Sequence, residues 1–321
     1  MDAKDLKCDI ERLISEIATL QHKVELLSSI CEKALHVSSL HYDLYGQRSR
    51  RPYYTLNDNW GLTSLDTGQL FFVNTEDRNI TPWLIMGGHW EPNVGRVLIE
   101  YTQPGMVVID AGAHLGYYTI KLGAKIGLTG YLFAFEPNPE VNAMCVENIK
   151  INGLSSNVML YKFALGDINT TATLTRSNSN MASANLVGDQ DVDMSVEVDV
   201  RKLDDVIDPN TEVDLIKLDA EGYEAKILKG ATGLLARSPR CAVMIEVGLE
   251  RWERQSNIDE LLDACGGGGR QVYAVRDDGT LEKFETQQIR PFLLTCAFHE
   301  NYFFIAREQD VLERIGHLVR T

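Results

Sequence analysis

Apolar positions near the start of the chain repeat with the spacing of a coiled coil. They are separated by alternating steps of four and three residues, with no Pro or Gly before Gly46. The seam consists of Leu6, Ile10, Leu13, Ile17, Leu20, Val24, Leu27, Cys31 and Ala34. β-branched residues at a with leucine at d favour a parallel two-stranded coil, so residues 1–40 are predicted to form an oligomerisation helix and the protein a homo-oligomer. Two alternatives stay open: a single amphipathic helix packed on its own domain, or a higher oligomer, because Ile14 and Ile30 widen the apolar stripe.

Residues 41–104 follow a different pattern, rich in aromatic and turn-forming residues. The basic stretch 46–51 reads as a solvated linker, and the residues after it as short strands and a helix that form a cap. A helix is predicted to begin near Glu91, because Pro92 suits a first helical turn.

From residue 105 to 321, short apolar runs alternate with amphipathic stretches. The runs predict strands over 106–110, 131–136, 158–164, 214–220 and 242–247, and helices between them over 116–126, 139–152, 223–236 and 257–265. Buried strands that alternate with helices indicate an α/β fold, a doubly wound and mostly parallel sheet with helices on both faces. Two last runs, 271–277 and 302–307, predict an antiparallel edge.

Charge and cysteine usage exclude several classes of function. Lys and Arg number 31 and Asp and Glu 46, which gives a net charge of −15 and argues on electrostatic grounds against nucleic acid as a partner. The six cysteines show no C-x-x-C pair or other close spacing, which argues against a zinc site and a disulfide framework and fits a reducing cytoplasm. No apolar run is long enough to span a bilayer, and the N-terminus is too polar for a signal peptide.

The first predicted strand of the α/β region runs into a glycine loop, DAGAHLGYYT. Gly112 allows a sharp turn, and Gly116 allows a close approach of the backbone to a ligand or strand. The next strand ends at Glu136, at a distance suited to an acid that binds the hydroxyls of a ribose. Loop and acid together favour a nucleoside-type cofactor, although Glu136 also fits a helix cap.

The stretch DLIKLDAEGYE (214–224) ends a buried strand on three acids, Asp219, Glu221 and Glu224. Three interpretations compete: a metal cage, a strand end that faces a cofactor, or the acidic first turn of a helix.

Four motifs in this order, VVIDAGAHLGYYT, FAFEPNPE, FALGD and DLIKLDAEGYEAKILKGA, resemble the FkbM-type S-adenosylmethionine-dependent methyltransferases. The resemblance covers roughly residues 70–307 and omits the N-terminal coil. It implies a Rossmann-like class I methyltransferase fold and transfer of a methyl group from S-adenosylmethionine.

The resemblance also implies roles for single residues. Asp110, Gly112, Gly116 and the adjacent Tyr117 would surround the methionine part of the cofactor, and Glu136 would bind its ribose. Asp167 would lie near the adenine, and Asp219 near the methionine amine or the reacting centre. His114 stands where family members usually have Asn, so it is either a cofactor ligand or a base.

Methylation of a hydroxyl requires a base that takes the hydroxyl proton. The candidate catalytic residues are His114, Asp219, Glu221 and Glu246, all near predicted strand ends. Asp219, Glu221 and Glu246 also suit a divalent ion, but the resemblance requires no metal and none is expected. Glu224 is assigned to the helix start, where an acid favours the positive end of the helix dipole.

The acceptor is predicted to be a hydroxyl of a sugar in a glycan or polysaccharide. The polar stretch 176–189 suits an active-site lid or a surface loop, and Trp60, Trp83 and Trp90 suit sugar stacking or a core. One alternative is a small secondary metabolite such as a polyketide. Another is a coiled-coil scaffold or pseudoenzyme in a biosynthetic complex.

Overall fold

The computed structural model describes residues 51–176, 184–185, 194–247, 262, 264–265, 269–293 and 300–320. The chain divides into two compact units, Met1–Tyr54 and Thr55–Thr321. The coiled-coil helix predicted over 1–40 and most of the helix predicted over 257–265 lie outside the described residues. The parallel dimer therefore stays a prediction.

The second unit begins with short strands and two helices. After β1 (Tyr54–Thr55), β2 (Trp60–Ser64) pairs antiparallel with β3 (Leu70–Asn74), and α2 (Thr81–Gly87) and α3 (Pro92–Tyr101) follow. The predicted start of a helix beside Glu91 is confirmed, with Pro92 as its first residue. The buried Asn148 fixes this region to the rest of the unit, because its side chain accepts from the Phe72 amide at 2.6 Å and donates to the Leu115 carbonyl at 2.8 Å.

The centre of the unit is an eight-stranded mixed sheet of order β14-β13-β15-β12-β11-β4-β5-β6. Its strands are β4 (Val107–Ala111), β5 (Tyr131–Phe135), β6 (Val158–Tyr161), β11 (Leu215–Leu218), β12 (Ala242–Val247), β13 (Gln271–Val275), β14 (Leu281–Phe284) and β15 (Glu300–Ile305). The strands from β6 to β12 are parallel, and β15 is antiparallel to both β12 and β13. The antiparallel pairing of the last two predicted strands is confirmed, but their place at the edge is wrong, since β14 forms the edge and β15 lies inside the sheet.

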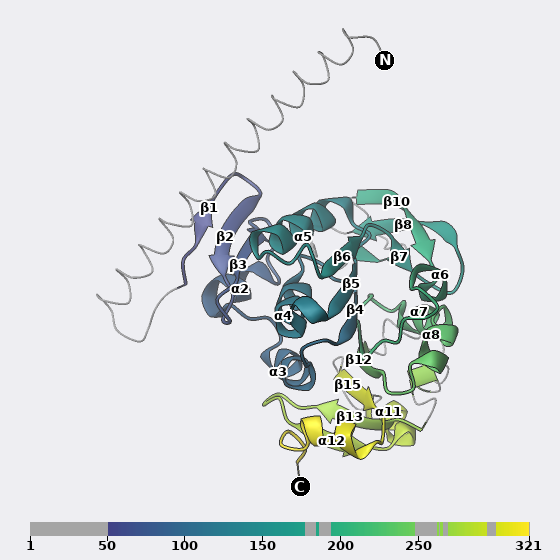
Figure 1. Ribbon diagram of the computed structural model, residues 1–321. Coiled ribbons are helices and arrows are strands. Elements are labelled where there is room, and N and C mark those ends of the chain that lie inside the picture. The colour runs from purple at the N-terminus through teal and green to yellow at the C-terminus, as the bar shows by residue number, and fades with distance from the viewer. Residues whose placement is uncertain are drawn as a thin grey trace. The chain divides into compact units, whose positions relative to one another are not determined.

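Helices cover both sides of this sheet. They are α4 (Tyr117–Ile126) with the short η1 (Gly127–Thr129), α5 (Pro139–Ile151), α6 (Leu203–Val206), α7 (Glu224–Lys229), α8 (Thr232–Arg237), α11 (Thr286–Leu293) and α12 (Gln309–Ile315). Figure 1 shows α3, α4 and α5 on one side of the central strands and α6, α7 and α8 on the other. The arrangement is the one that alternating strands and helices predicted.

The side chains of β4 and β11 alternate between these two sides. Ile109 and Ile216 belong to the apolar core that also contains Leu203 and Leu234, on the side of α6 and α8. Asp110, next to Ile109, binds Thr119 of α4 instead. The parallel core strands therefore carry charged side chains on the face toward α4.

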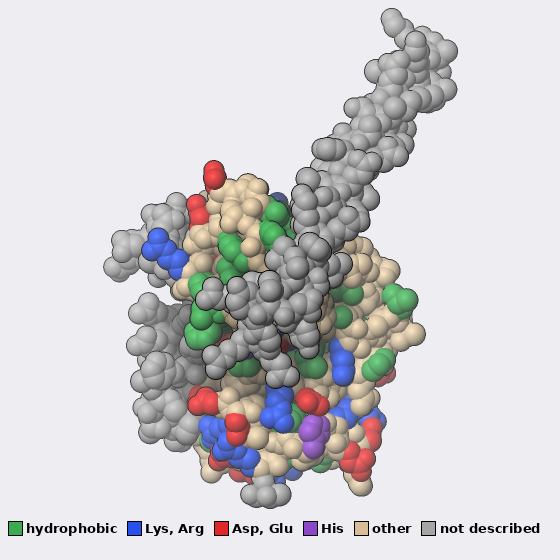
Figure 2. All heavy atoms as spheres, turned by 90° about the vertical axis from the view of Figure 1, so that its left-hand side faces the viewer, with side chains coloured by type: hydrophobic (Ala, Val, Ile, Leu, Met, Phe, Trp, Pro, Cys, Tyr) green, Lys and Arg blue, Asp and Glu red, His purple; other side chains and the backbone are tan. Residues whose placement is uncertain are grey.

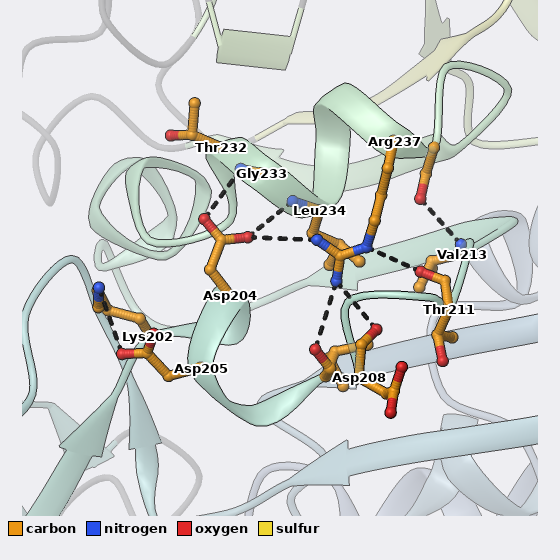
Figure 3. Close-up of polar contacts among 12 residues, drawn as sticks. Lys202, Asp204, Asp205, Asp208, Thr211, Val213, Thr232, Gly233, Leu234 and Arg237 are labelled. Carbon is orange, nitrogen blue, oxygen red and sulfur yellow. Dashed lines mark hydrogen bonds and ion pairs between the residues drawn. The ribbon is translucent and has the colours of Figure 1, made fainter.

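The helix predicted over 223–236 is split into α7 and α8 at Gly230. A Cβ atom on Gly230 would overlap the carbonyl oxygen of Gly166, so the two backbones touch. Asp204 of α6 then accepts from two amides in the first turn of α8, those of Gly233 at 2.9 Å and Leu234 at 2.7 Å (Figure 3). Arg237 at the end of α8 donates to the carbonyl of Thr211, so both ends of α8 are held by polar contacts (Figure 3).

The strand predicted over 158–164 is also divided. Its first part is β6, which belongs to the main sheet, and its end is the separate strand β7 (Ala164–Leu165). β7 lies in a second sheet, where it pairs parallel with β10 (Met194–Arg201), and β10 pairs antiparallel with β8 (Thr170–Arg176). The short β9 (Ala184–Asn185) pairs with β8. Most of the predicted lid, 176–189, lies outside the described residues.

Charges of both signs share the described surface. Figure 2 shows Lys and Arg side chains intermingled with Asp and Glu side chains on the lower part of one face. Ion pairs such as Arg320 with Asp278, at 2.8 Å, compensate basic side chains locally. No helix within the described ranges has the length and apolar character needed to cross a membrane.

Candidate functional site

A buried lysine joins the carboxyl ends of β4 and β11. The strand register places Lys217 beside Asp110. Its Nζ lies 3.6 Å from Asp110 Oδ1, 3.2 Å from Asp219 Oδ2 and 3.4 Å from the Gly112 carbonyl oxygen. Asp110 also accepts a hydrogen bond from Thr119 Oγ1 at 2.6 Å. Two predicted site residues, Asp110 and Asp219, are therefore brought together by a cation that sequence reasoning had not assigned to the site.

The charges of this cluster depend on one another. Burial alone would lower the pKa of Lys217, but Asp219, Asp110 and Glu91 outweigh it and the pKa is raised, so the side chain stays an ammonium. Burial raises the pKa of Asp110, and Lys217 and Thr119 oppose that rise. The Lys217 ammonium is also 4.9 Å from the centre of the Tyr118 ring, a cation–π contact.

The loops after β4 and β11 are in backbone contact. Gly112 has φ of 81°, and a Cβ atom there would overlap the carbonyl oxygen of Asp219. The Asp219 amide donates to the Ala111 carbonyl at 3.1 Å. Gly116 has φ of 91°, and its Cβ would lie 2.8 Å from the sulfur of Cys145. Gly112 therefore makes the predicted sharp turn, whereas the close neighbour of Gly116 is a side chain of α5.

Glu136 lies directly beside the glycine loop. Its Oε2 accepts from the His114 amide at 2.9 Å and its Oε1 from the Asn138 amide at 2.8 Å. Burial raises its pKa to about 7, although both amides oppose the shift. The carboxyl group is thus fixed in orientation, and each oxygen retains a lone pair for a further donor.

The half-buried His114 has φ of 51°. Burial lowers the pKa of its imidazole, and the charges of Asp77 and Asp219 act against that shift. The ring is therefore neutral at neutral pH and has both a donor and an acceptor nitrogen.

The acids that follow Asp219 have separate roles. Glu224 is the first residue of α7, which confirms its predicted place at the helix start. Its Oε1 accepts from the amides of Ala220 at 2.8 Å and Gly222 at 3.2 Å, so it holds the loop in shape. Burial raises the pKa of Glu224 to about 7. Glu221 has φ of 54°, a conformation that non-glycine residues rarely adopt.

The remaining predicted residues lie farther from this cluster or at its border. The Tyr117 hydroxyl lies 3.1 Å from Lys121 Nζ, so its ring points toward a separate polar group. Asp167 forms an ion pair with Lys229 at 3.3 Å. Glu246 follows Ile245, the partner of Leu218 in the register, and thus lies on β12 beside the position of Asp219. Their roles toward a cofactor stay predictions.

Sequence reasoning missed Lys217 and Glu91. Lys217 lies inside the apolar run LIKL, where its alkyl stem fits a buried strand. A single lysine between aliphatic residues gives no sign in the sequence that its ammonium group has acidic partners. Glu91 was noticed only as the residue before Pro92.

Two buried polar atoms beside the loop bear on the cofactor that the sequence implies. Asn138 Nδ2 has no hydrogen-bond partner, and Asp110 Oδ1 has only its ion pair with Lys217. S-adenosylmethionine offers hydroxyl, amine and carboxylate groups to such donors and acceptors, so the residues present fit it. As for a metal, no group of three or more His, Cys, Asp or Glu side chains in the described part of the chain is arranged to hold an ion.

Two known methyltransferases are similar to about half of this chain. A hexuronic acid methyltransferase, AglP, from Haloferax volcanii is 28% identical over 178 residues, which span 52% of this chain and 67% of that protein. The methyltransferase sdnD from Sordaria araneosa is 27% identical over 193 residues, 50% of this chain and 72% of that one.

A solved structure, that of M. jannaschii TYW2 in complex with AdoMet, matches with a TM-score of 0.41 and 17% identity over 78% of this chain and 87% of that one. The model of the methyltransferase FkbM domain matches residues 110–299, more than half of the chain and the part that contains the strand ends just described. The chain belongs to the family of methyltransferases with an FkbM domain.

Proposed function

We propose that the protein is an S-adenosylmethionine-dependent O-methyltransferase that acts on a hydroxyl of a sugar in a glycan. The observation that supports it most is the fixed carboxyl group of Glu136 beside the Gly112–Gly116 loop, with its two oxygens oriented by backbone amides. Such a carboxyl group can accept from two neighbouring hydroxyls, as those of a ribose.

In this proposal the cofactor supplies an electrophilic methyl group on a sulfonium, and the chain binds and orients it. Asp219, a third exposed, would attract the cofactor's ammonium or sulfonium. Asp110 and Lys217 would fix the backbone of the glycine loop, because Lys217 donates to the Gly112 carbonyl. Asp167 and Tyr117 would contact the cofactor at the border of the site, Tyr117 through its backbone.

The sugar acceptor rests on the relative named for hexuronic acid methylation. The alternative acceptor is a small secondary metabolite. A scaffold or pseudoenzyme is the alternative of another class. Assembly as a parallel dimer through residues 1–40 and a cytoplasmic location belong to the proposal as well.

Cofactor binding is tested by calorimetry with S-adenosylmethionine. Glu136→Gln should weaken the affinity about 10- to 100-fold, because a hydrogen bond to a charged acceptor is worth roughly 1.5–3 kcal/mol. Glu147→Gln, a change of an exposed glutamate on α5, should leave it unchanged. A wild-type protein that does not bind the cofactor would revive the scaffold alternative.

The acceptor is tested with methyl-labelled S-adenosylmethionine and two probes, a methyl glucoside and a methyl glucuronoside. Methylation of a hydroxyl gives an ether that resists mild alkali, whereas methylation of a carboxylate gives an ester that alkali removes. Alkali-stable label on a sugar supports the proposal. Label that alkali removes completely would refute O-methylation of a hydroxyl.

A further inference from the structure

Three non-glycine residues in the described ranges have positive φ: Glu91 at 42°, His114 at 51° and Glu221 at 54°. Such a backbone costs roughly 1–3 kcal/mol and tends to occur at functional sites. His114 and Glu221 lie in the loops after β4 and β11. Glu91 comes from a different element, since it precedes α3, and it lies before the region that the family model matches.

The side chain of Glu91 nevertheless belongs to the same cluster. Its Oε2 accepts a hydrogen bond from the Tyr118 hydroxyl at 2.9 Å. Lys217 Nζ lies 4.9 Å from the centre of the Tyr118 ring, and the charges of Lys217 and Asp219 both act on the Glu91 carboxyl. The start of α3 thus brings a carboxyl group to the strand ends that hold the proposed cofactor site.

We propose that Glu91 is the general base that takes the proton of the acceptor hydroxyl, a role that rests on the proposed function. As the acceptor oxygen forms its bond to the methyl carbon, the bond from that carbon to sulfur breaks and sulfur keeps the electron pair. The hydroxyl proton passes to the Glu91 carboxylate and from there to solvent.

The other acids of the cluster are less suited to this step. Asp219 is already engaged in an ion pair with the ammonium of Lys217, at 3.2 Å. Asp110 is fully buried and cannot meet an acceptor. Glu136 and Glu224 bind backbone amides of the loops.

Glu91 differs from these acids in position and basicity. It is half-buried and so retains a path for the proton to solvent. Burial first, and then the charge of Asp219, raise its pKa to about 7, while Lys217 and the Tyr118 hydrogen bond oppose the rise. A general base works best when its pKa is near the working pH.

The role also makes a prediction about the class of acceptor. A hydroxyl loses its proton during transfer, whereas a carboxylate has none to lose. Glu91 should therefore matter for transfer to the hydroxyls of the glucoside probe and be dispensable for any transfer to the carboxylate of the glucuronoside.

The test compares Glu91→Gln with Glu100→Gln, which changes an exposed glutamate near the other end of the same helix. Glu91→Gln should keep the melting temperature and the affinity for S-adenosylmethionine and lower kcat on hydroxyls about 10²- to 10⁴-fold. Glu100→Gln should behave as wild type. Carbon-13 NMR of the free protein should show a glutamate carboxyl that titrates near pH 7 and is lost in Glu91→Gln.

A pH profile separates a base from a structural residue. Wild-type kcat should rise with pH through about 7, and Tyr118→Phe should move that rise to higher pH, because the Tyr118 hydrogen bond lowers the pKa of Glu91. Wild-type turnover retained in Glu91→Gln, or lost together with cofactor binding, would overturn the role of Glu91. The failure of wild-type protein to methylate any hydroxyl would instead refute the proposed function.

Discussion

Replacement of Lys217 by Met tests whether the buried cation stabilises the strand ends. Lys217 is 5% exposed and Asp110 is not exposed at all, so the variant leaves the Asp110 carboxylate without its counter-charge. Removing one partner of a buried pair costs about 3–5 kcal/mol. At about 2–4 °C per kcal/mol for a unit of this size, the melting temperature should fall by roughly 10 °C.

The assays are thermal unfolding and urea unfolding, both followed by circular dichroism, with a matched control. Lys229→Met removes a lysine that is 70% exposed and paired with Asp167, and it should cost less than about 1 kcal/mol. The double variant Lys217→Met/Asp110→Asn should recover much of the loss, because both charges of the buried pair are then removed. A Lys217→Met protein as stable as the control, or no recovery in the double variant, would refute the reasoning.

Three further changes probe single features. Gly112→Ala should destabilise the protein by more than about 2 kcal/mol and abolish binding of S-adenosylmethionine, because the added Cβ would overlap the Asp219 carbonyl. Gly68→Ala, at a glycine with a similar φ but in open space, should bind S-adenosylmethionine normally in calorimetry. Glu224 holds a proton more tightly in the folded protein, because its pKa is raised from 4.5 to about 7. The free energy of unfolding should therefore fall as pH rises from 4.5 to 7, by about 3 kcal/mol from this group. Glu224→Gln should make this pH dependence weaker in urea unfolding, and an unchanged pH dependence would contradict the prediction. Asp204→Ala should cost about 0.5–2 kcal/mol in the same assay by freeing the first-turn amides of α8, and a loss below this range would mean that water replaces the cap.

Much of the fold could be predicted because local pattern and packing agree. The strand over 242–247 is predicted with its observed bounds, and Pro92 marks the start of α3. The place of β15 between β12 and β13 could not be predicted, since the order of strands in a sheet depends on contacts between distant segments. The break at Gly230 was missed for the same reason: its cause is the backbone of Gly166.

The candidate site was predicted where motif and strand end coincide. Asp110, Glu136 and Asp219 were found because each closes or follows an apolar run. Lys217 escaped because a lysine inside such a run shows its partners only in the folded sheet. Glu91 escaped because its backbone conformation and its contact with Tyr118 have no local sequence signal.

The excursion from β7 to β10 is anchored at its two ends and carries its own apolar core. The Gly166 amide donates to the Arg201 carbonyl at 3.0 Å, and the Lys202 amide to the Asn169 side chain at 3.0 Å. Leu174, Val198 and Val200 pack together apart from the main core. Because its entry and exit lie side by side, we expect that this segment can be replaced by protein engineering without disturbing the central sheet, which would change what the protein contacts while the strand ends stay in place.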